Sequence, residues 1–358
     1  MSALWVLGAG QLGAMLKQAG TPLGVDVRPV DIESTETLPL DENDIVTAER
    51  EEWPETVATK QLATHSNFVN LDTFPQLADR LTQKQWLDKL ELATAPWFPV
   101  KNDSTAQYAY DTLGERVLMK RRRGGYDGKG QYWLKASENT QIPNDWKGAA
   151  IAEQAINFDE EMSLVGVRGK DGQCYFYPLT LNLHINGILY ASVSPLKRLS
   201  PLQGKAEAML SKLMEALDYV GVMAMECFRV GDELLINELA PRVHNSGHWT
   251  QAGATTCQFE NHVRAVTGLP LAPTAVKNQS MMVNLIGVDV DYDWLNIEGL
   301  ELYWYKKSVR PGRKVGHLNM CSGDLEKLQS MLSNLNEKLP EPYPQALEWL
   351  SKNLPETI

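Results

Sequence analysis

The segment MAMECFRVGDELLINELA, residues 223–240, carries two acidic residues inside otherwise apolar runs and predicts a β-hairpin. Glu226 and Glu238 each lie where a lone carboxylate would be costly to bury unless it is matched. A three-residue turn at 231–233 would put Glu226 directly opposite Glu238. A two-residue turn would put Asn237 opposite Glu226 instead. Paired carboxylates repel unless a cation lies between them, and such hard oxygen ligands suit Mg²⁺ bound to nucleotide phosphates. The alternative is that one or both acids are exposed at a sheet edge.

Upstream of the hairpin, the run KRRRGGYDGKGQ, residues 120–131, joins two strand-like segments through a glycine-rich loop. Glycines let the backbone of such a loop fold its amide groups over phosphates. Basic side chains at 121–123 and at Lys129 surround the loop in a chain that is acidic overall. This contrast favours a flap that closes over a polyanion, against the alternative of a solvated hairpin tip. The spacing is not that of a GxxxxGK[ST] loop, so a P-loop nucleotide triphosphatase is excluded.

The N-terminus predicts a βαβ unit with a parallel sheet, in which residues 3–7 and 24–30 form strands around a helix. Between them lies Gly8-x-Gly10-x-x-Gly13, a turn whose amides, with the following helix, can bind a phosphate. Asp31 follows 18 residues after Gly13, close to the ribose-binding acid of a dinucleotide fold. These residues alone leave three alternatives: a dehydrogenase, another phosphate site, or a turn that binds nothing. Further strands are expected at 45–48 and 68–70, and a helix at 75–92.

Two more clusters of polar residues could bind anions. The segment APRVHNSGHW, residues 240–249, follows the acidic hairpin directly. His244 and His248 have the spacing of a helical metal pair, but no glutamate lies between them and Ser246-Gly247 favours a loop. An anion pocket around Arg242 is therefore favoured over a zinc site. Near the C-terminus, residues 306–314 contain five cations, which fit a phosphate clamp or a solvated turn equally well.

The composition bounds the class of protein. The chain has 358 residues, 43% of them apolar, which predicts two or three domains. Its net charge of −11, from 34 basic and 45 acidic residues, argues against nucleic acid or an anionic membrane as partner. No window approaches the ~18 continuous apolar residues of a membrane span, and no signal peptide is expected. The four cysteines form no C-x-x-C pair, which fits a reduced, cytoplasmic protein.

Taken together, GGYDGKGQ, MAMEC, INELAPR and RVHNSGHWT resemble the ATP-grasp superfamily and, more narrowly, the 5-(carboxyamino)imidazole ribonucleotide synthase family of purine biosynthesis. GAGQLG at the start and RPGRKVGHLN near the end extend the resemblance over nearly the whole chain. It implies an α/β fold (α+β overall) with a Rossmann-like pre-ATP-grasp domain at 1–80. A two-lobed ATP-grasp domain would follow at 81–268, and a small β-rich C-terminal domain at 269–358.

The resemblance also implies an activity. The reaction would be the ATP-dependent carboxylation of 5-aminoimidazole ribonucleotide with bicarbonate through carboxyphosphate, giving the carboxyamino ribonucleotide, ADP and phosphate. ATP and Mg²⁺ would be the cofactors, and the protein would be a homodimer. A glycine flap that excludes water has a chemical purpose here, because carboxyphosphate is short-lived in water.

Roles of individual residues follow from the same resemblance. ATP would be contacted by Arg80 and Lys120, and its phosphates would be covered by Gly124, Gly125, Tyr126, Asp127, Gly128, Lys129, Gly130 and Gln131. The adenine would be lined by Glu153, Gln154, Ala155 and Ile156, and the ribose by Glu161, with His184 and Asn237 nearby. Mg²⁺ would be held by Glu226 and Glu238. Bicarbonate and carboxyphosphate would be bound by Arg242, His244, Asn245 and Ser246, with Lys120 offsetting charge on the transferred phosphoryl group. The ribose phosphate of the substrate would be bound by Gly10, Gln11, Leu12, Lys306, Arg313 and Lys314.

One position departs from the wider superfamily. Many relatives have an asparagine ligand two residues after the second acid, where this chain has Ala240. Two carboxylates, waters and phosphates would then complete the metal shell. Three other functions stay open: a different ATP-grasp ligase with another acceptor, a dehydrogenase built on Gly8–Gly13 and Asp31, and a nucleotide sensor without catalysis. The dehydrogenase leaves the acid pair unexplained, and the intact carboxylates argue against the sensor.

Overall fold

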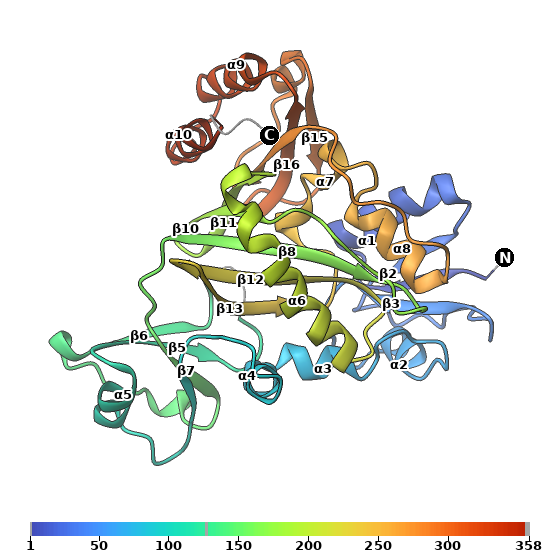
Figure 1. The fold of residues 1–358 in the computed structure, drawn as a ribbon. Helices are drawn as coiled ribbons and strands as arrows, with labels where there is room; N and C mark the ends of the chain where they lie inside the picture. Colours follow the sequence, from blue (N-terminus) through green and yellow to red (C-terminus); the bar gives the residue numbers. More distant parts are fainter. Residues whose placement is uncertain (1, 126–127, 355–358) are drawn as a thin grey trace.

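The computed structural model describes residues 2–125 and 128–354, and its described strands form three sheets (Figure 1). Tyr126 and Asp127, two of the predicted flap residues, lie outside the described residues. The strands are β1 (Leu4–Leu7), β2 (Val27–Val30), β3 (Ile45–Ala48), β4 (Trp97–Val100), β5 (Arg116–Arg121), β6 (Gln131–Lys135), β7 (Ala150–Gln154), β8 (Glu160–Arg168), β9 (Cys174–Phe176), β10 (Thr180–Ile185), β11 (Ile188–Ser194), β12 (Gly221–Val230), β13 (Glu233–Ala240), β14 (Gln279–Ile286), β15 (Leu300–Trp304) and β16 (Lys314–Ser322). The α-helices are α1 (Gln11–Gly20), α2 (Val57–Ala63), α3 (Thr73–Ala78), α4 (Arg80–Lys89), α5 (Ala106–Leu113), α6 (Ser200–Ala216), α7 (Thr250–Gly253), α8 (Gln258–Thr267), α9 (Leu325–Asn336) and α10 (Tyr343–Asn353).

The N-terminal sheet has the order β2-β1-β3 with both pairs parallel. The predicted βαβ unit is therefore confirmed, with α1 as the connecting helix. The strand expected at 68–70 is wrong, because this segment contributes only an isolated bridge between Phe68 and Val46. Asn70 has a φ of 64°, and this left-handed conformation ends the extended run.

A four-stranded sheet, β4-β7-β5-β6, forms a separate lobe with α5 at the lower left of Figure 1. The helix expected at 75–92 is interrupted. Asp79 has extended backbone angles (φ −90°, ψ 110°) that separate α3 from α4, and its side chain accepts a hydrogen bond from the Leu81 amide at 3.0 Å. Asp79 is thus the N-cap of α4, the helix that brings Arg80 and Lys84 beside the four-stranded lobe.

The large sheet has nine strands in the order β13-β12-β8-β10-β11-β14-β16-β15, with β9 paired to β8. Strand β14 pairs with β11, so the sheet runs across the domain limit predicted at 268/269. Helix α6 crosses one face of this sheet, and α9 and α10 cover its C-terminal end (Figure 1). None of the helices in the described part of the chain is long and apolar enough to cross a membrane.

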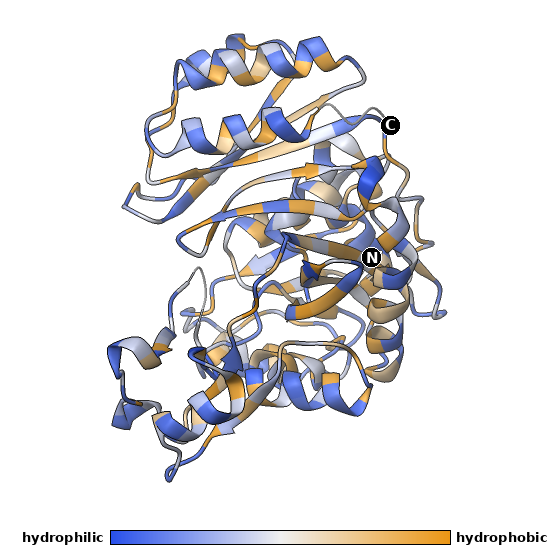
Figure 2. Cartoon of the chain, turned by 60° about the vertical axis from the view of Figure 1, so that its left-hand side comes forward, coloured by the Kyte–Doolittle hydropathy of each residue, from blue (hydrophilic) through white to orange (hydrophobic). Residues whose placement is uncertain are grey.

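The largest hydrophobic core lies between the strands of the large sheet and the helices α6, α9 and α10. Helix α9 shows why: Leu328, Met331, Leu332 and Leu335 recur on one face and are buried. Figure 2 shows the matching alternation of hydrophilic and hydrophobic residues along the outer helices. Strands β8, β10, β12 and β13 of this sheet carry the polar side chains of Glu161, His184, Glu226 and Glu238, and we call this part of the sheet the platform.

Candidate active site

The two predicted metal ligands lie side by side on the platform. Glu226 of β12 is directly opposite Glu238 of β13, so the predicted pairing is confirmed. The sequence predicts this pairing only for a three-residue turn, and that turn length is wrong. Val230 pairs with Glu233, which leaves a two-residue turn, and a bulge beside Cys227 then shifts the register by one residue. The bulge places Asn237 as the extra residue and brings the two acids opposite each other.

The environment of the acid pair favours a cation. Burial, with the nearby charges of Glu238 and Glu161, raises the pKa of Glu226 above its usual value, against the opposing charge of His184. Glu238 lies 3.3 Å from the Arg80 guanidinium, which offsets part of its charge. Among the described residues no group of three or more His, Cys, Asp or Glu is placed to hold a metal ion. A divalent ion here would have two protein carboxylates, and water or ligand oxygens would have to supply the rest.

Lys120 reaches the same platform from the four-stranded lobe. Its Nζ donates to Asn237 Oδ1 at 2.8 Å and lies 2.7 Å from Glu153 Oε2. The other oxygen of Glu153 lies 2.7 Å from the Nζ of Lys84, a residue that sequence reasoning missed. All three charged side chains are almost completely buried. The sequence does not show that Lys84 is buried whereas Lys89, on the same helix, is exposed. No sequence signal could therefore have identified Lys84 as a site residue.

The Lys84–Glu153–Lys120 triad shares one carboxylate between two ammonium groups. Burial works to raise the pKa of Glu153, but the charges of Lys120 and Lys84 outweigh it and the pKa is lowered. Burial also lowers the pKa of Lys84, and Lys120 repels it, although Glu153 attracts it. The triad carries one net positive charge, which is suited to an anionic ligand. Because both lysines contact the Glu153 side chain, an adenine at residues 153–156 would be contacted mainly by the backbone of this segment and by its other side chains.

Arg80 links the glycine loop to the acid pair. Its guanidinium donates to the carbonyl oxygens of Arg121 and Gly125 at 3.2 and 3.1 Å, besides its contact with Glu238. On the far side of the loop, Gly128 has a φ of 75°, and an added Cβ would lie 3.1 Å from the Asn186 carbonyl oxygen. Gly125 therefore lies beside Arg80, and Gly128 lies beside the β10–β11 turn.

The arginines before the loop do not form the free cationic cluster that the sequence predicts. Arg122 binds Asp79 through two nitrogens, Arg121 pairs with Asp145, and Arg123 lies 2.7 Å from Glu52. Carboxylates distant in sequence pair with all three arginines, so these arginines do not support the flap, which stays a prediction. Positive charge near the acid pair comes instead from the net charge of the triad, from Arg80 and from Lys314.

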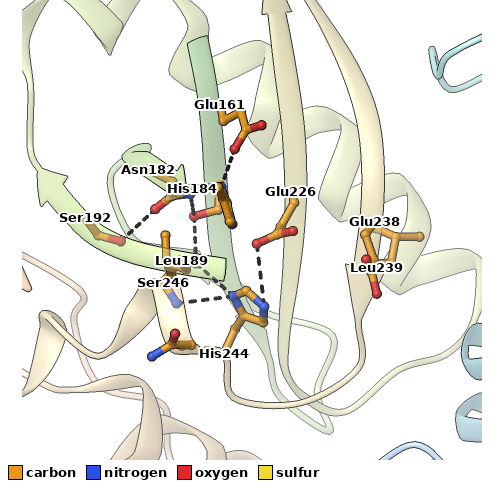
Figure 3. Close-up of polar contacts among 12 residues, drawn as sticks. Glu161, Asn182, His184, Leu189, Ser192, Glu226, Glu238, Leu239, His244 and Ser246 are labelled. Carbon is orange, nitrogen blue, oxygen red and sulfur yellow. Dashed lines mark hydrogen bonds and ion pairs between the residues drawn. The ribbon is translucent and has the colours of Figure 1, made fainter. Parts of the chain in front are cut away.

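Of the predicted ribose and adenine residues, Glu161 and His184 lie near Glu226 of the acid pair. Glu161 on β8 binds His184 Nδ1 on β10, and this bond, with the charge of Glu226, raises the pKa of His184 although burial opposes it (Figure 3). Gln154, Ala155 and Ile156 form the end of β7 and the segment that follows it. Beyond that segment Phe158 stacks on Phe228 with ring centroids 4.5 Å apart, an aromatic pair that sequence reasoning missed.

The residues after β13 form a pocket next to Glu226. His244 Nε2 lies 3.7 Å from Glu226 Oε1, and His244 Nδ1 lies 2.9 Å from Ser246 Oγ (Figure 3). Burial, together with the charges of Arg242 and Lys314, lowers the pKa of His244 well below its usual value, so the ring is neutral at pH 7. The influence of Lys314, the first residue of β16, means that the C-terminal basic run reaches this pocket.

Two residues that sequence reasoning missed hold this pocket in place. Glu51 from the N-terminal unit lies 3.1 Å from the Nε of Arg242, and burial raises the pKa of Glu51. Asn284 on β14 exchanges two amide hydrogen bonds with Asn245, at 2.9 and 2.7 Å. Both partners come from segments far away in the sequence, and only the folded chain brings them to the pocket.

The glycine turn and the C-terminal basic run, predicted to share one phosphate, are brought together. Lys307 donates to the side chain of Gln11 at the start of α1, and Arg313 donates to Ser308 at 2.5 Å, while Lys306 is exposed. Two amides of the turn, however, are already occupied. Gly10 N donates to Glu49 Oε1 at 2.6 Å, and Gly13 N donates to Glu49 Oε2.

Glu49 is therefore an internal anion at the helix N-terminus. The amide of Gly10 donates to Glu49 in this structure, so this amide is not available to a phosphate while Glu49 holds it. Binding of the substrate phosphate by Gly10, Gln11 and Leu12 together with the basic run stays a prediction. Asp31, the ribose-binding acid of the dehydrogenase alternative, is exposed and accepts a hydrogen bond from the Glu33 amide at 3.0 Å.

Comparison with known proteins agrees with this arrangement. A family model of the ATP-grasp domain matches residues 85–259, and one of the phosphoribosylaminoimidazole carboxylase C-terminal domain matches residues 280–331. N5-carboxyaminoimidazole ribonucleotide synthase of Escherichia coli (strain K12) is 54% identical over 349 residues, which cover 98% of both chains.

Solved structures give the same match. The crystal structure of N5-carboxyaminoimidazole ribonucleotide synthetase from Thermus thermophilus has a TM-score of 0.84 and 41% identity, over 94% of this chain and 99% of that one. An ADP complex of an N5-carboxyaminoimidazole ribonucleotide synthetase has a TM-score of 0.79 and 28% identity, over 92% of this chain and 96% of that one.

Proposed function

Since the chain belongs to the N5-carboxyaminoimidazole ribonucleotide synthase family of ATP-grasp ligases, we propose that its site carboxylates 5-aminoimidazole ribonucleotide with bicarbonate at the expense of ATP. The predicted fold class, with its ATP-grasp domain, is confirmed by the same matches. The observation that carries the proposal is the acid pair, Glu226 opposite Glu238, beside a buried lysine and a neutral histidine.

Two steps make up the proposed reaction. A bicarbonate oxygen attacks the γ-phosphorus of ATP, the bond from that phosphorus to the bridging oxygen breaks, and ADP leaves, which gives carboxyphosphate. The exocyclic amine of the ribonucleotide then attacks the carboxyl carbon, the carbon–oxygen bond to phosphate breaks, and the amine loses a proton as phosphate leaves. In the first step Lys120 and Arg80 would offset charge on the transferred phosphoryl group.

Bicarbonate and carboxyphosphate would lie between Glu226 and the pocket after β13. Arg242, held by Glu51, would attract the anion, and the amide of Asn245, fixed by Asn284, would orient it. His244 and Ser246 would complete the pocket on the side facing Glu226. The glycine loop beside Arg80 would exclude water from the short-lived intermediate.

Glu226 and Glu238 would hold Mg²⁺, and their chemistry fits this ion, because hard carboxylate oxygens are ligands that Mg²⁺ prefers. Burial and the charge of Glu238 raise the pKa of Glu226, and a divalent cation between the two would oppose that effect. When bound, Mg²⁺ would neutralise negative charge on the phosphates of the nucleotide. The absence of an asparagine at Ala240 leaves phosphate oxygens and water to complete the shell.

The ribose phosphate would be bound by Gly10, Gln11 and Leu12 with Lys306, Arg313 and Lys314, which the Lys307–Gln11 contact supports. The proposal also includes three domains with limits at 80/81 and 268/269, a homodimer, and a cytoplasmic location, as the family resemblance implies. Light scattering of the purified chain tests the dimer.

Phosphate release tests the activity. The wild-type chain is mixed with MgATP and bicarbonate, with and without 5-aminoimidazole ribonucleotide, and released phosphate is measured. We expect release that the ribonucleotide stimulates, and that is lost when bicarbonate or, through a chelator, Mg²⁺ is removed. Release that is indifferent to the ribonucleotide would point to another ATP-grasp acceptor, and failure to bind ATP would refute the ligase.

Glu226→Gln tests the metal site within the same assay. We expect it to abolish phosphate release while the far-ultraviolet circular dichroism spectrum stays that of the wild type. Glu233→Gln is the matched control, because Glu233 is exposed on the same hairpin and pairs with Lys205 away from the platform. Unchanged turnover in Glu226→Gln would remove Glu226 from the site.

A further inference from the structure

A chain of buried side chains leads from the interior of the large sheet to His244 (Figure 3). Ser192 on β11 donates to Asn182 Oδ1 at 2.8 Å, and Asn182 Nδ2 donates to Ser163 Oγ at 2.9 Å. Ser163 on β8 donates in turn to Ser246 Oγ at 2.7 Å, and Ser246 Oγ lies 2.9 Å from His244 Nδ1. The serines have no exposed surface, and Asn182 has 5%. We call these four residues, Ser192, Asn182, Ser163 and Ser246, the polar relay.

The direction of the hydrogen bonds in the polar relay is set at its end. The backbone amide of Ser246 donates to His244 Nδ1 at 3.3 Å. A backbone amide can only donate, so Nδ1 must be an acceptor and carries no hydrogen. The Ser246 hydroxyl, which also contacts Nδ1, therefore donates to it. Ser246 Oγ is then free to accept from Ser163, as the rest of the polar relay requires.

The far end of the polar relay agrees with this direction. The oxygen and nitrogen of an amide side chain can be exchanged by a half-turn of the group. With the amide of Asn182 turned in this way, donor and acceptor would change places in every hydrogen bond of the polar relay. Ser246 would then have to accept a hydrogen from His244 Nδ1, which the backbone amide of Ser246 opposes. Only one orientation satisfies every member of the polar relay, and in it each buried group has its partner.

The ring hydrogen of His244 must consequently lie on Nε2, the nitrogen that faces Glu226 Oε1 at 3.7 Å. A ring in this tautomer offers a hydrogen-bond donor to the space in front of Glu226 and cannot accept a proton there. We propose that Ser192, Asn182 and Ser163 are positioning residues that hold His244 as an Nε2–H donor toward an anionic oxygen in this space. The inference rests on the proposed function only where that oxygen is identified as one of bicarbonate or carboxyphosphate.

The tautomer is measured directly by nuclear magnetic resonance of the protein with ¹⁵N-labelled histidine rings. The chain has six histidines, and the His244 signals are those lost in His244→Gln. We expect the wild type to show hydrogen on Nε2 and a bare Nδ1. Hydrogen on Nδ1 in the wild type would overturn the proposal, whether or not the protein has the proposed activity. The spectrum thus separates failure of this inference from failure of the proposed function.

Ser163→Ala breaks the polar relay at its middle with the loss of one oxygen atom. Ser246 then loses its donor, and its hydroxyl is free to turn away from His244. We expect the ring signals to show a mixture of tautomers and kcat to fall about three- to tenfold, the effect of one hydrogen bond. The KM for ATP should not change. Ser280→Ala is the matched control, because Ser280 is equally buried on β14 but donates to the Asn278 carbonyl oxygen outside the relay.

Asn182→Asp reverses the polar relay without a change of shape. A carboxylate only accepts, so Ser163 would turn its hydrogen to residue 182 and accept from Ser246. Ser246 would then face His244 Nδ1 as an acceptor, and we expect the Nδ1–H tautomer to gain population and kcat to fall further than in Ser163→Ala. If both variants keep the wild-type ring spectrum, or if kcat falls while the spectrum is unchanged, the relay has a structural role only and the proposal is refuted.

Discussion

Substitution of Lys84 by methionine tests how the buried triad works. Methionine fills most of the same space but has no charge, so Glu153 keeps only its 2.7 Å contact with Lys120. The hydroxyl of Thr94, which accepts from Lys84 Nζ at 2.5 Å, also loses a donor. The triad changes from one net positive charge to none, and we expect ATP to bind more weakly, as measured by calorimetry.

The cost in stability follows from the shared carboxylate. A hydrogen bond to a buried charged group contributes about 1.5–3 kcal/mol. Part of this is offset in Lys84→Met, because burial already lowers the pKa of Lys84 and so opposes its charge in the folded chain. We expect the free energy of unfolding to fall by about 1–2 kcal/mol. Glu153→Gln should cost more, about 3–5 kcal/mol, because two buried ammonium groups would then lack a counter-charge.

Urea unfolding at neutral pH, followed by circular dichroism, measures both variants. Lys89→Met is the control, because Lys89 is exposed on the same helix, with its Nζ over the Trp86 ring at 4.3 Å from the centroid. Its unfolding free energy should change by at most about 0.5 kcal/mol. A loss in Lys84→Met equal to or larger than that in Glu153→Gln would contradict a carboxylate shared between two cations.

Three other predictions concern the phosphate clamp, the glycine loop and a buried histidine. Arg313→Ala should raise the KM for the ribonucleotide far more than that for ATP, and equal effects in steady-state kinetics would refute the clamp. Gly128→Ala should raise the KM for ATP, because the left-handed φ of 75° and the nearby Asn186 carbonyl disfavour a Cβ; Gly204→Ala, with open space around it, should not. Burial lowers the pKa of His262 to about 4 from 6.5, so only the unfolded chain takes up this proton as the pH falls below 6.5. The free energy of unfolding should therefore fall by about 3 kcal/mol between pH 6.5 and 4. His262→Gln should remove this part of the pH dependence, as measured by urea unfolding at several pH values.

Local pattern was enough to predict much of the fold. The apolar run before the glycine turn and the acidic hairpin both form the elements that their sequence patterns indicate. The pairing of Glu226 with Glu238 was predicted correctly but for the wrong turn length. A bulge depends on how the whole ladder packs, and the sequence of the hairpin carries no sign that distinguishes it from an added turn residue.

The contacts between distant segments could not be predicted. Lys84, Glu51 and Asn284 carry no motif of their own, and their roles depend on which segments the fold places next to Glu153, Arg242 and Asn245. For the arginines before the flap, the sequence alone indicates a role that the distant contacts do not support. Their cluster looks like an anion site in sequence, yet each arginine is neutralised by an acid that a single chain segment cannot reveal.

Glu49 also bears on protein engineering. The amides of the GxGxxG turn are an attractive place to install a nicotinamide cofactor, because its pyrophosphate binds at such a helix start. In this chain the position already holds a carboxylate, and a side chain at Gly8 would collide with it. A designer would have to delete Glu49 and fill the space it leaves before any dinucleotide could enter. More generally, the glycines of such a turn can be required by the protein's own acid, so searches that count this motif as a cofactor site would include chains that bind none there.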